Sequence, residues 1–467
     1  MKTIGIIAFF VCSSLLALGQ GAEQLYQEYC ADCHGARFQG GSAQSLVDGV
    51  WQFGESEEAV AKSIREGIDH LGMPDYGDEL TAGQISDLTR FLLDSEKKAL
   101  EQRSRIPDTL KTLDYEIDVE IFAEGLEIPW SIAFLDKDTA LITERPGRLR
   151  VIDKGHLFSK PVEGTPKVVA EGQGGLLAVA FDPDYAEEGN QWVYLAYSHG
   201  LDPEPNGKRP GAMTKLVRGR INGNKWTDEQ VVFEAPHETY RTTRHHYGTR
   251  IVFDRDKVLY FAIGDRGNGS DAQDLARPNG KIHRILRDGS IPKNNPFRLK
   301  KDVMDSIYAC GVRNPQGLAI HPATGQLWES EHGPKGGDEI NLIQSGKNYG
   351  WPIITYGINY NDTPITDIVR REGMEQPAFY WRPSTAACGL DFYDGDLFPK
   401  WKNKLLAGAL KYEDVRLLDL ENDRVMHEEV ILKNAGRVRD VVCGPDGAIY
   451  VVLNKPDIIL RLTPKTD

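Results

Sequence analysis

The chain has 467 residues, of which 40% are hydrophobic and 27% charged, a composition typical of a globular protein with two or three domains. Its 47 glycines favour a turn-rich β protein over a helical one. The net charge of −14 argues against nucleic-acid binding, which needs a basic surface. Residues 21–96 hold 15 Asp and Glu against four Lys and Arg. That acidic segment suits docking to a basic partner, or only maintains solubility.

Residues 1–20 have the pattern of a secretory signal. Lys2 precedes an apolar run from Ile4 to Leu18, and small residues follow around Gly19. The run is too short to favour a stable membrane span. We therefore predict a periplasmic or secreted protein with no membrane span in its mature form.

A small haem-binding module is predicted for residues 21–96. Cys30-Ala-Asp-Cys33-His34 has the spacing of a c-type haem attachment site, in which two thiols bind the haem covalently and the histidine ligates iron. A redox Cys pair and half of a zinc site are the alternatives. Neither is favoured, because no second Cys/His pair and no βαβ pattern accompany the motif.

Met73 is the predicted second iron ligand. It lies in a loop before the last helix of the module, is followed by Pro74, and offers a thioether that raises haem potential. His70 as the ligand, or a core role for Met73, is the alternative. Helices are predicted over 22–29, 57–68 and 81–93, so the module resembles a small all-α class I cytochrome c. Residues 97–116 are predicted to form a linker, helical at its start.

A repeat begins at residue 117. An apolar triplet, a turn rich in Asp, Pro and Gly, and a second apolar run recur six times, with the triplets at 132–134, 179–181, 251–253, 318–320, 390–392 and 441–443. This pattern predicts an all-β six-bladed β-propeller over residues 117–467, with four strands in each blade. A two-sheet β sandwich is less favoured, because it does not need six similar hairpins.

Polar residues gather just before or after these predicted strands, where propeller loops converge on one cavity. One His, three Arg and one Lys among them suit an anion, and Arg suits carboxylates best. An oxygen-rich loop near Gly333 suits Ca²⁺. The residues of this cluster are Gln173, His246, Arg313, Asn314, Lys411, Arg437 and Arg439.

Several motifs carry a family resemblance. They are Gly-Gln-Gly-Gly-Leu-Leu, His-Tyr-Gly-Thr-Arg, Arg-Asn-Pro-Gln-Gly-Leu, Glu-His-Gly-Pro-Lys-Gly-Gly-Asp-Glu-Ile-Asn, Asn-Tyr-Gly-Trp-Pro and Arg-Val-Arg-Asp. In this order they resemble the soluble quinoprotein aldose sugar dehydrogenases of the glucose/sorbosone dehydrogenase family. The resemblance covers roughly residues 117–465. It implies a six-bladed propeller that binds pyrroloquinoline quinone (PQQ) and Ca²⁺.

The resemblance also implies roles for individual residues. His246 matches the catalytic base, and Arg313 polarises the quinone. The matching PQQ contacts are Gln173, Arg313, Asn314, Ser384, Lys411, Arg437 and Arg439. Gly333 and Pro334 match the carbonyls that hold the active-site Ca²⁺. Glu339 and Tyr349 are the residues implied for a second, structural calcium site.

Two positions depart from the family pattern. His245 stands where the best-studied glucose enzymes have an Asp beside the base, which leaves the orientation of His246 open. Ala387 and Cys388 replace a common Pro-Ser. In an oxidising compartment two of Cys310, Cys388 and Cys443 can pair, with Cys310–Cys388 as one candidate.

The predicted function is oxidation of aldose sugars at the anomeric carbon to lactones. Electrons then pass to the fused haem c and on to an external redox partner. A calcium-dependent propeller lactonase and a non-catalytic binding propeller are the alternatives. The Arg and Lys cluster argues against the lactonase, and retention of His246 argues against the binding module.

Overall fold

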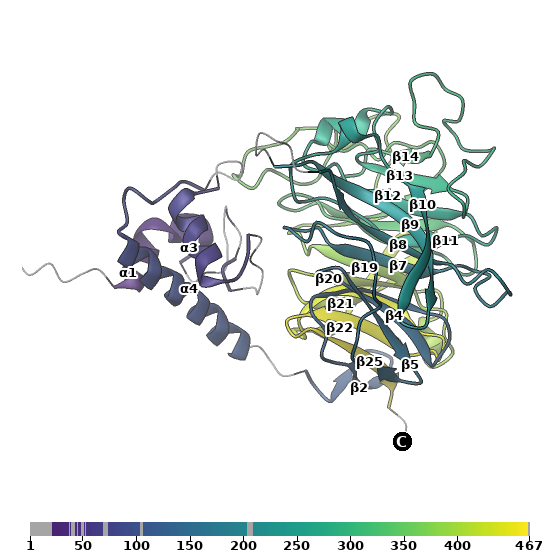
Figure 1. Ribbon diagram of the computed structural model, residues 1–467, viewed down its shortest axis with the longest axis horizontal. Helices are drawn as coiled ribbons and strands as arrows, with labels where there is room; N and C mark the ends of the chain where they lie inside the picture. Colours follow the sequence, from purple (N-terminus) through teal and green to yellow (C-terminus); the bar gives the residue numbers. More distant parts are fainter. Residues whose placement is uncertain are drawn as a thin grey trace, which may run out of the picture. The chain divides into compact units, whose positions relative to one another are not determined.

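The computed structural model describes residues 21–36, 38, 43, 45–47, 51, 53–68, 73–102, 106–202 and 209–465. The predicted signal and His70 lie outside them. The chain divides into two compact units, a helical one up to Ala99 and a β-rich one from Leu100 onward (Figure 1). None of the described helices combines the length and the apolar character needed to cross a membrane.

The helical unit has the predicted all-α character. Its helices are α1 (Ala22–Tyr29), α2 (Ala31–His34), α3 (Glu57–Glu66) and α4 (Ala82–Gln102). Ser56 caps α3 by accepting a hydrogen bond from the Ala59 N–H. The apolar faces bury Leu25, Ile64 and Leu88 in one core. Helix α4 continues past its predicted end at residue 93, because the residues that follow are mostly good helix formers.

The β-rich unit consists of six separate antiparallel sheets, and this confirms the six-bladed propeller. Each predicted triplet lies in the first strand of a blade. We number the blades 1 to 6 by these inner strands: β3 (Pro129–Phe134), β7 (Leu176–Phe181), β11 (Ile251–Phe253), β15 (Pro315–Ile320), β19 (Ala387–Phe392) and β23 (Arg437–Cys443).

The remaining strands complete the blades outward from the axis. Blade 1 adds β4 (Thr139–Glu144), β5 (Arg148–Asp153) and β6 (His156–Leu157), and blade 2 adds β8 (Val193–Gly200), β9 (Ala212–Asn222) and β10 (Lys225–Phe233). Blade 3 adds β12 (Leu259–Ile263), β13 (Lys281–Ile285) and β14 (Ile307–Cys310), and blade 4 adds β16 (Leu327–Glu331), β17 (Asp338–Ile343) and β18 (Phe379–Trp381). Blade 5 adds β20 (Leu405–Ala409), β21 (Asp414–Glu421) and β22 (Arg424–Lys433), and blade 6 adds β24 (Ile449–Asn454) and β25 (Ile458–Pro464).

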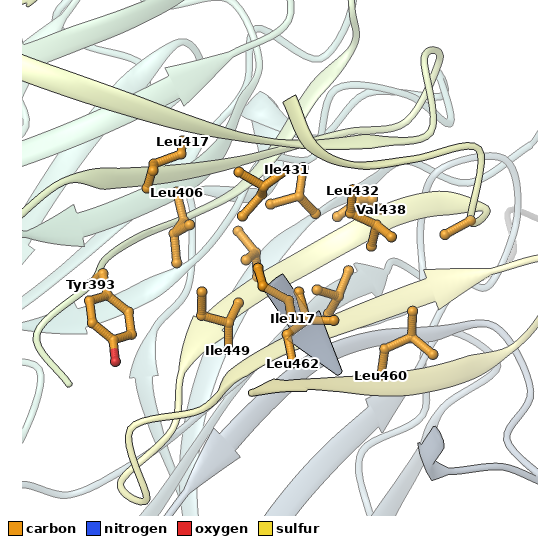
Figure 2. Close-up of a cluster of buried hydrophobic side chains, with 14 of the residues drawn as sticks. Ile117, Tyr393, Leu406, Leu417, Ile431, Leu432, Val438, Ile449, Leu460 and Leu462 are labelled. Atoms are coloured by element: carbon orange, nitrogen blue, oxygen red, sulfur yellow. The ribbon is translucent and has the colours of Figure 1, made fainter. Parts of the chain in front are cut away.

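Blade 6 is completed from the beginning of the propeller. Strand β2 (Glu116–Ala123) pairs with β25, so that Ile117 lies opposite Pro464. Strand β1 (Thr109–Lys111), inside the predicted linker, pairs in turn with β2. Figure 2 shows Ile117 pointing into the apolar cluster beneath this junction, where it is fully buried. The ring is thus closed by hydrogen bonds between the two ends of the propeller.

Antiparallel pairing brings the functional loops to one face of the propeller. The start of each inner strand lies beside the end of the second strand, as the pairs Pro315–Glu331 and Arg437–Asn454 show. Loops that enter inner strands and loops that leave second strands therefore lie at the same end. We call this end the site face.

The three propeller cysteines are free, so the disulfide that two of them could have formed is absent. Cys388 is fully buried, and its Sγ donates a hydrogen bond to the Arg439 carbonyl at 3.1 Å. Cys310 lies at the outer edge of blade 3, on β14. The two thiols occupy different blades, which sequence position alone does not reveal.

Candidate functional site

His246 is held from two sides at the site face. It enters blade 3 with a φ of +56°, a left-handed conformation uncommon outside glycine and often found at functional sites. Its backbone N–H donates to Gln173 Oε1 at 2.8 Å, and its Nδ1 lies 2.6 Å from Asp265 Oδ1. Because Nδ1 is engaged, Nε2 is the nitrogen left to exchange a proton.

Asp265 orients the imidazole. It follows strand β12 and accepts further hydrogen bonds from Gly267 N–H and Trp351 Nε1–H, both at 2.8 Å. Burial opposes its negative charge, yet His246 and Arg313 outweigh burial and hold the pKa of Asp265 below its usual value. Burial, followed by the Arg313 charge, lowers the pKa of His246. The pair therefore consists of a carboxylate and a neutral imidazole at neutral pH.

The orientation of His246, which the replacement of an Asp by His245 had left open, is fixed by Asp265. The carboxylate that fixes His246 comes from the loop after β12 and not from the preceding residue. The His245 carbonyl accepts a hydrogen bond from Arg266, and burial lowers the pKa of its imidazole to about 3. His245 thus places a neutral ring beside His246, with 4.6 Å between the ring centroids.

Arg313 lies against the predicted calcium loop. Its Nη1 donates to the carbonyls of His332 at 2.9 Å and Gly333 at 2.8 Å. Glu331 Oε2 accepts the backbone N–H groups of both Arg313 and Asn314. A buried carboxylate at the end of β16 therefore fixes the backbone that enters β15.

Asn314 is fully buried, and protein groups already occupy its amide. Its Oδ1 accepts from Gly248 N–H at 3.2 Å and from Gln316 Nε2 at 3.1 Å. Its Nδ2 lies 3.4 Å from His332 Nδ1. Asn314 connects the entries of blades 3 and 4, and its contact with a quinone stays a prediction.

Asp338 joins the predicted calcium loop to the loop that precedes blade 5. Its Oδ1 accepts from Gly333 N–H at 2.9 Å and from Ser384 Oγ at 2.7 Å. Its Oδ2 accepts from Ala387 N–H at 3.2 Å. Ser384 therefore faces Asp338, and the loop with the unusual Ala387-Cys388 pair is tied to Gly333.

The basic residues of blades 5 and 6 differ in exposure. Arg439 is buried, donates from Nε to Asn454 Oδ1 at 2.7 Å, and lies with Cζ 4.3 Å from the centroid of the Trp130 ring. Burial lowers its pKa to about 9. Arg437 begins β23 on the site face. Lys411 is exposed and borders a cavity of about 520 Å³.

The two residues implied for a second calcium site make separate contacts. Glu339 Oε2 lies 3.3 Å from Asn341 Nδ2, which also donates to Glu329. Tyr349 donates its hydroxyl to the Leu342 carbonyl at 2.5 Å. A calcium ion between Glu339 and Tyr349 stays a prediction.

Sequence reasoning missed Asp265 and His332. Burial, followed by the charges of Arg313, His246, Arg439 and Arg437, lowers the pKa of His332 well below its usual value, which places His332 among these groups. Features of the sequence could have indicated both residues. Asp265 lies two residues after the apolar run of β12, and His332 stands between Glu331 and Gly333 in the Glu-His-Gly-Pro motif.

Two of the predicted haem-binding residues lie against one small core. Cys30 and Met73 both pack against the apolar cluster of the helical unit, and His34 ends helix α2. Tyr76 donates its hydroxyl to the Tyr29 carbonyl at 2.9 Å, near the motif. Burial, followed by the neighbouring Cys33, raises the pKa of the Cys30 thiol to about 11.

Comparison with family models matches both units. The model of the glucose/sorbosone dehydrogenase family matches residues 126–461. The model described as cytochrome c oxidase, cbb3-type, subunit III matches residues 17–92. The first match covers well over half of the chain.

Individual relatives agree with these matches. The aldose sugar dehydrogenase YliI of Escherichia coli (strain K12) is 42% identical over 356 residues, which span 75% of this chain and 93% of that protein. The apo form of the soluble aldose sugar dehydrogenase from Escherichia coli superposes with a TM-score of 0.68 at 39% identity, over 75% of this chain and all of that one.

A PQQ-bound aldose sugar dehydrogenase from Streptomyces coelicolor also superposes. Its TM-score is 0.57 at 25% identity, over 75% of this chain and 98% of that one. Sequence and fold thus agree. The chain belongs to the glucose/sorbosone dehydrogenase family of oxidoreductases and carries an N-terminal cytochrome c domain of the cbb3 type.

Proposed function

We propose that this protein is a periplasmic or secreted dehydrogenase that oxidises the anomeric carbon of aldose sugars to lactones, with PQQ, Ca²⁺ and a covalently bound haem c. The observation that carries the proposal is the His246–Asp265 pair beside Arg313 on the site face. The naming of the relatives as aldose sugar dehydrogenases supports the sugar substrate.

The chain's own residues account for proton removal. His246 Nε2 accepts the proton of the anomeric hydroxyl, while Asp265 keeps the opposite nitrogen engaged and stabilises the imidazolium that forms. Loss of that proton and of a hydride from C1 converts the cyclic hemiacetal to a lactone. A positioned base of this kind contributes typically ~10²–10⁴-fold to the rate.

The basic groups of the site face fit an anionic cofactor. Arg313 Nε is buried and has no hydrogen-bond partner among the described residues, so it is available to donate to an acceptor of a ligand. When bound, PQQ supplies a reducible quinone that takes up two electrons. The residues proposed to hold it are Gln173, Arg313, Asn314, Ser384, Lys411, Arg437 and Arg439.

The carbonyls of Gly333 and Pro334 are the proposed ligands of the active-site Ca²⁺. Carbonyl oxygens are ligands that Ca²⁺ prefers, and the Gly333 oxygen faces Arg313 in the site. Asp338 fixes the same loop from the other side. Glu339 and Tyr349 are the proposed ligands of the second calcium ion.

The haem is the proposed exit for the electrons. Cys30 and Cys33 would bind it covalently, and His34 and Met73 would ligate its iron, a pair of ligands typical of electron-transfer cytochromes. A sugar gives up two electrons and a haem accepts one at a time. Two successive transfers to an external redox protein therefore complete each turnover.

Reconstitution of the full chain tests this function. The haem-loaded apoprotein is supplied with PQQ and Ca²⁺, offered a panel of aldoses, and followed by haem absorbance. We expect reduction of the haem with at least one sugar and release of the lactone. Failure of every sugar to reduce the haem or an added dye contradicts the proposal. His246→Gln is expected to bind PQQ yet lose turnover.

A further inference from the structure

His332 is a partly buried residue of the site face to which no role has been given. It follows strand β16 directly and precedes Gly333. Its carbonyl accepts from Arg313 Nη1 at 2.9 Å. Its ring is held by one described contact, Nδ1 to Asn314 Nδ2 at 3.4 Å.

The hydrogen-bond network around Asn314 fixes the tautomer of His332. Asn314 Oδ1 accepts from Gly248 N–H and from Gln316 Nε2. If the amide were reversed, Nδ2 would face these two donors and could not accept their hydrogen bonds. Nδ2 is therefore the group that faces His332. Because an amide nitrogen only donates, Nδ1 of His332 is the acceptor, and the ring proton is on Nε2.

That Nε2–H group has no acceptor. The atom is buried, and it has no hydrogen-bond partner among the residues that the structure describes. The charges that act on the ring come from Arg313, Arg437 and Arg439, which carry donors and positive charge, together with His246, which makes no hydrogen bond to His332 Nε2. A buried donor left unpaired is unfavourable by about 1–3 kcal/mol, so an acceptor from outside the protein completes this group.

We infer that His332 donates its Nε2–H to an acceptor oxygen or nitrogen of bound PQQ and is a further residue of the cofactor site. This inference rests on the proposed function. It adds a neutral, directional donor to a set of predicted contacts made up largely of charged groups. A neutral donor fixes orientation by geometry, whereas the arginines attract the carboxylates over longer range.

The test compares two measurements on haem-loaded, PQQ-free protein. His332→Leu is expected to bind PQQ about tenfold more weakly in a spectroscopic titration, because a hydrogen bond to a charged ligand is lost. The same variant without PQQ is expected to melt close to the wild-type temperature, because removal of the unpaired Nε2–H offsets loss of the long 3.4 Å contact between Nδ1 and Asn314 Nδ2. A residue with only a structural role gives the opposite result, a lower melting temperature.

Two further variants sharpen the test. His332→Gln keeps an N–H donor and is expected to recover part of the affinity. His283→Gln is the matched control, because His283 is a buried histidine with partners for both ring nitrogens, Ser306 Oγ and the Pro278 carbonyl, each at 3.0 Å. It is expected to lower the melting temperature and leave PQQ affinity unchanged.

The outcomes separate the two proposals. Wild-type affinity in His332→Leu, or a fall in its PQQ-free melting temperature like that of His283→Gln, overturns the role of His332 and leaves the dehydrogenase intact. Absence of PQQ binding by the wild-type protein itself overturns the proposed function, and the role of His332 falls with it.

Discussion

At the scale of single residues, Asp265 determines what His246 is able to do. Its carboxylate contacts Nδ1 at 2.6 Å and is itself fixed by Gly267 and Trp351. A fixed acceptor at Nδ1 selects one tautomer and leaves Nε2 unprotonated. The negative charge of Asp265 also raises the proton affinity of His246, against burial and Arg313, which lower it.

Substituting Asp265→Asn gives the first prediction. We expect kcat to fall roughly 100-fold, because the amide neither fixes the tautomer nor stabilises the imidazolium. The acid limb of the kcat/KM profile should move to lower pH. The reason is that removal of a negative charge lowers the pKa of His246 further, so the base stays neutral to lower pH.

Dye-linked sugar oxidation measured across pH checks both parts of this prediction. Trp351→Phe is the matched control, since it removes a hydrogen bond to the other oxygen of Asp265 and leaves the contact with His246 in place. A smaller loss of kcat is expected there. An acid limb that moves to higher pH in Asp265→Asn contradicts the assignment.

Asp338 gives a second prediction at this scale. Asp338→Asn replaces one acceptor oxygen with an NH₂ group that faces hydrogen-bond donors. The hydrogen bond that holds either the Gly333 loop or the loop from Ser384 to Ala387 is then lost. We expect calcium affinity to fall about tenfold, because a buried donor loses its acceptor. Calcium titration of the apoprotein by calorimetry measures this. Asp362→Asn, which affects only an exposed ion pair with Lys335, should leave the affinity unchanged.

Sequence motifs predicted residue types better than residue contacts. His246 and Arg313 stand together on the site face as expected. Asp265 and His332 were missed, because their roles depend on which loops meet across blades. The free state of Cys388 depends on the same kind of information. The spacing of residues along the chain does not show which loops of different blades are in contact.

At the scale of elements, the inner strands position the site and β2 holds the ring together. Within blade 6, β2 lies between β1, which precedes it in the sequence, and β25, the last strand of the chain. It contributes Ile117 to the core of this blade. Its pairing with β25 joins residues more than 330 positions apart in sequence. Closure of this kind removes the exposed edges that an open ring of sheets leaves.

A pair of substitutions on β2 measures the contribution of closure. Ile117→Ala, at a fully buried position, should lower the free energy of unfolding by about 2–5 kcal/mol. Ile121→Ala lies on the same strand with 56% of the residue exposed, and should change it by less than about 0.5 kcal/mol. Urea unfolding followed by tryptophan fluorescence compares them. Equal effects refute a special role for the buried position.

The elements were more predictable than the contacts between them. Six apolar triplets marked the six inner strands, because each buried strand needs a short apolar run. The closing strand was not anticipated, since β2 pairs with the last strand of the chain, and the sequence does not reveal so distant a partner. The end of α4 was set too early, because helix-forming residues continue where the apolar periodicity fades.

At the scale of the whole molecule, each unit has its own core. The helical unit packs around Leu25 and Leu88, whereas the propeller has separate clusters between its blades. Damage to the haem site should therefore leave the propeller folded. The two activities, sugar oxidation and haem reduction, are expected to be separable by substitution.

Met73→Ala tests this separation. We expect a lower haem reduction potential, because the thioether ligand raises it, and an altered visible spectrum. Sugar oxidation measured with a dye that bypasses the haem should keep its wild-type rate. Redox titration of the purified chain measures the potential. An unchanged potential assigns the second ligand to another residue, such as His70.

The pairing of β2 with β25 has a topological consequence. The blades form a closed ring, and the two ends of the propeller chain meet inside one sheet, where β2 and β25 are paired. None of the proposed catalytic or cofactor-binding residues lies on β1 or β2. A domain can therefore be fused before the first strand of the propeller without interrupting any blade. The cytochrome c domain occupies this position in the chain.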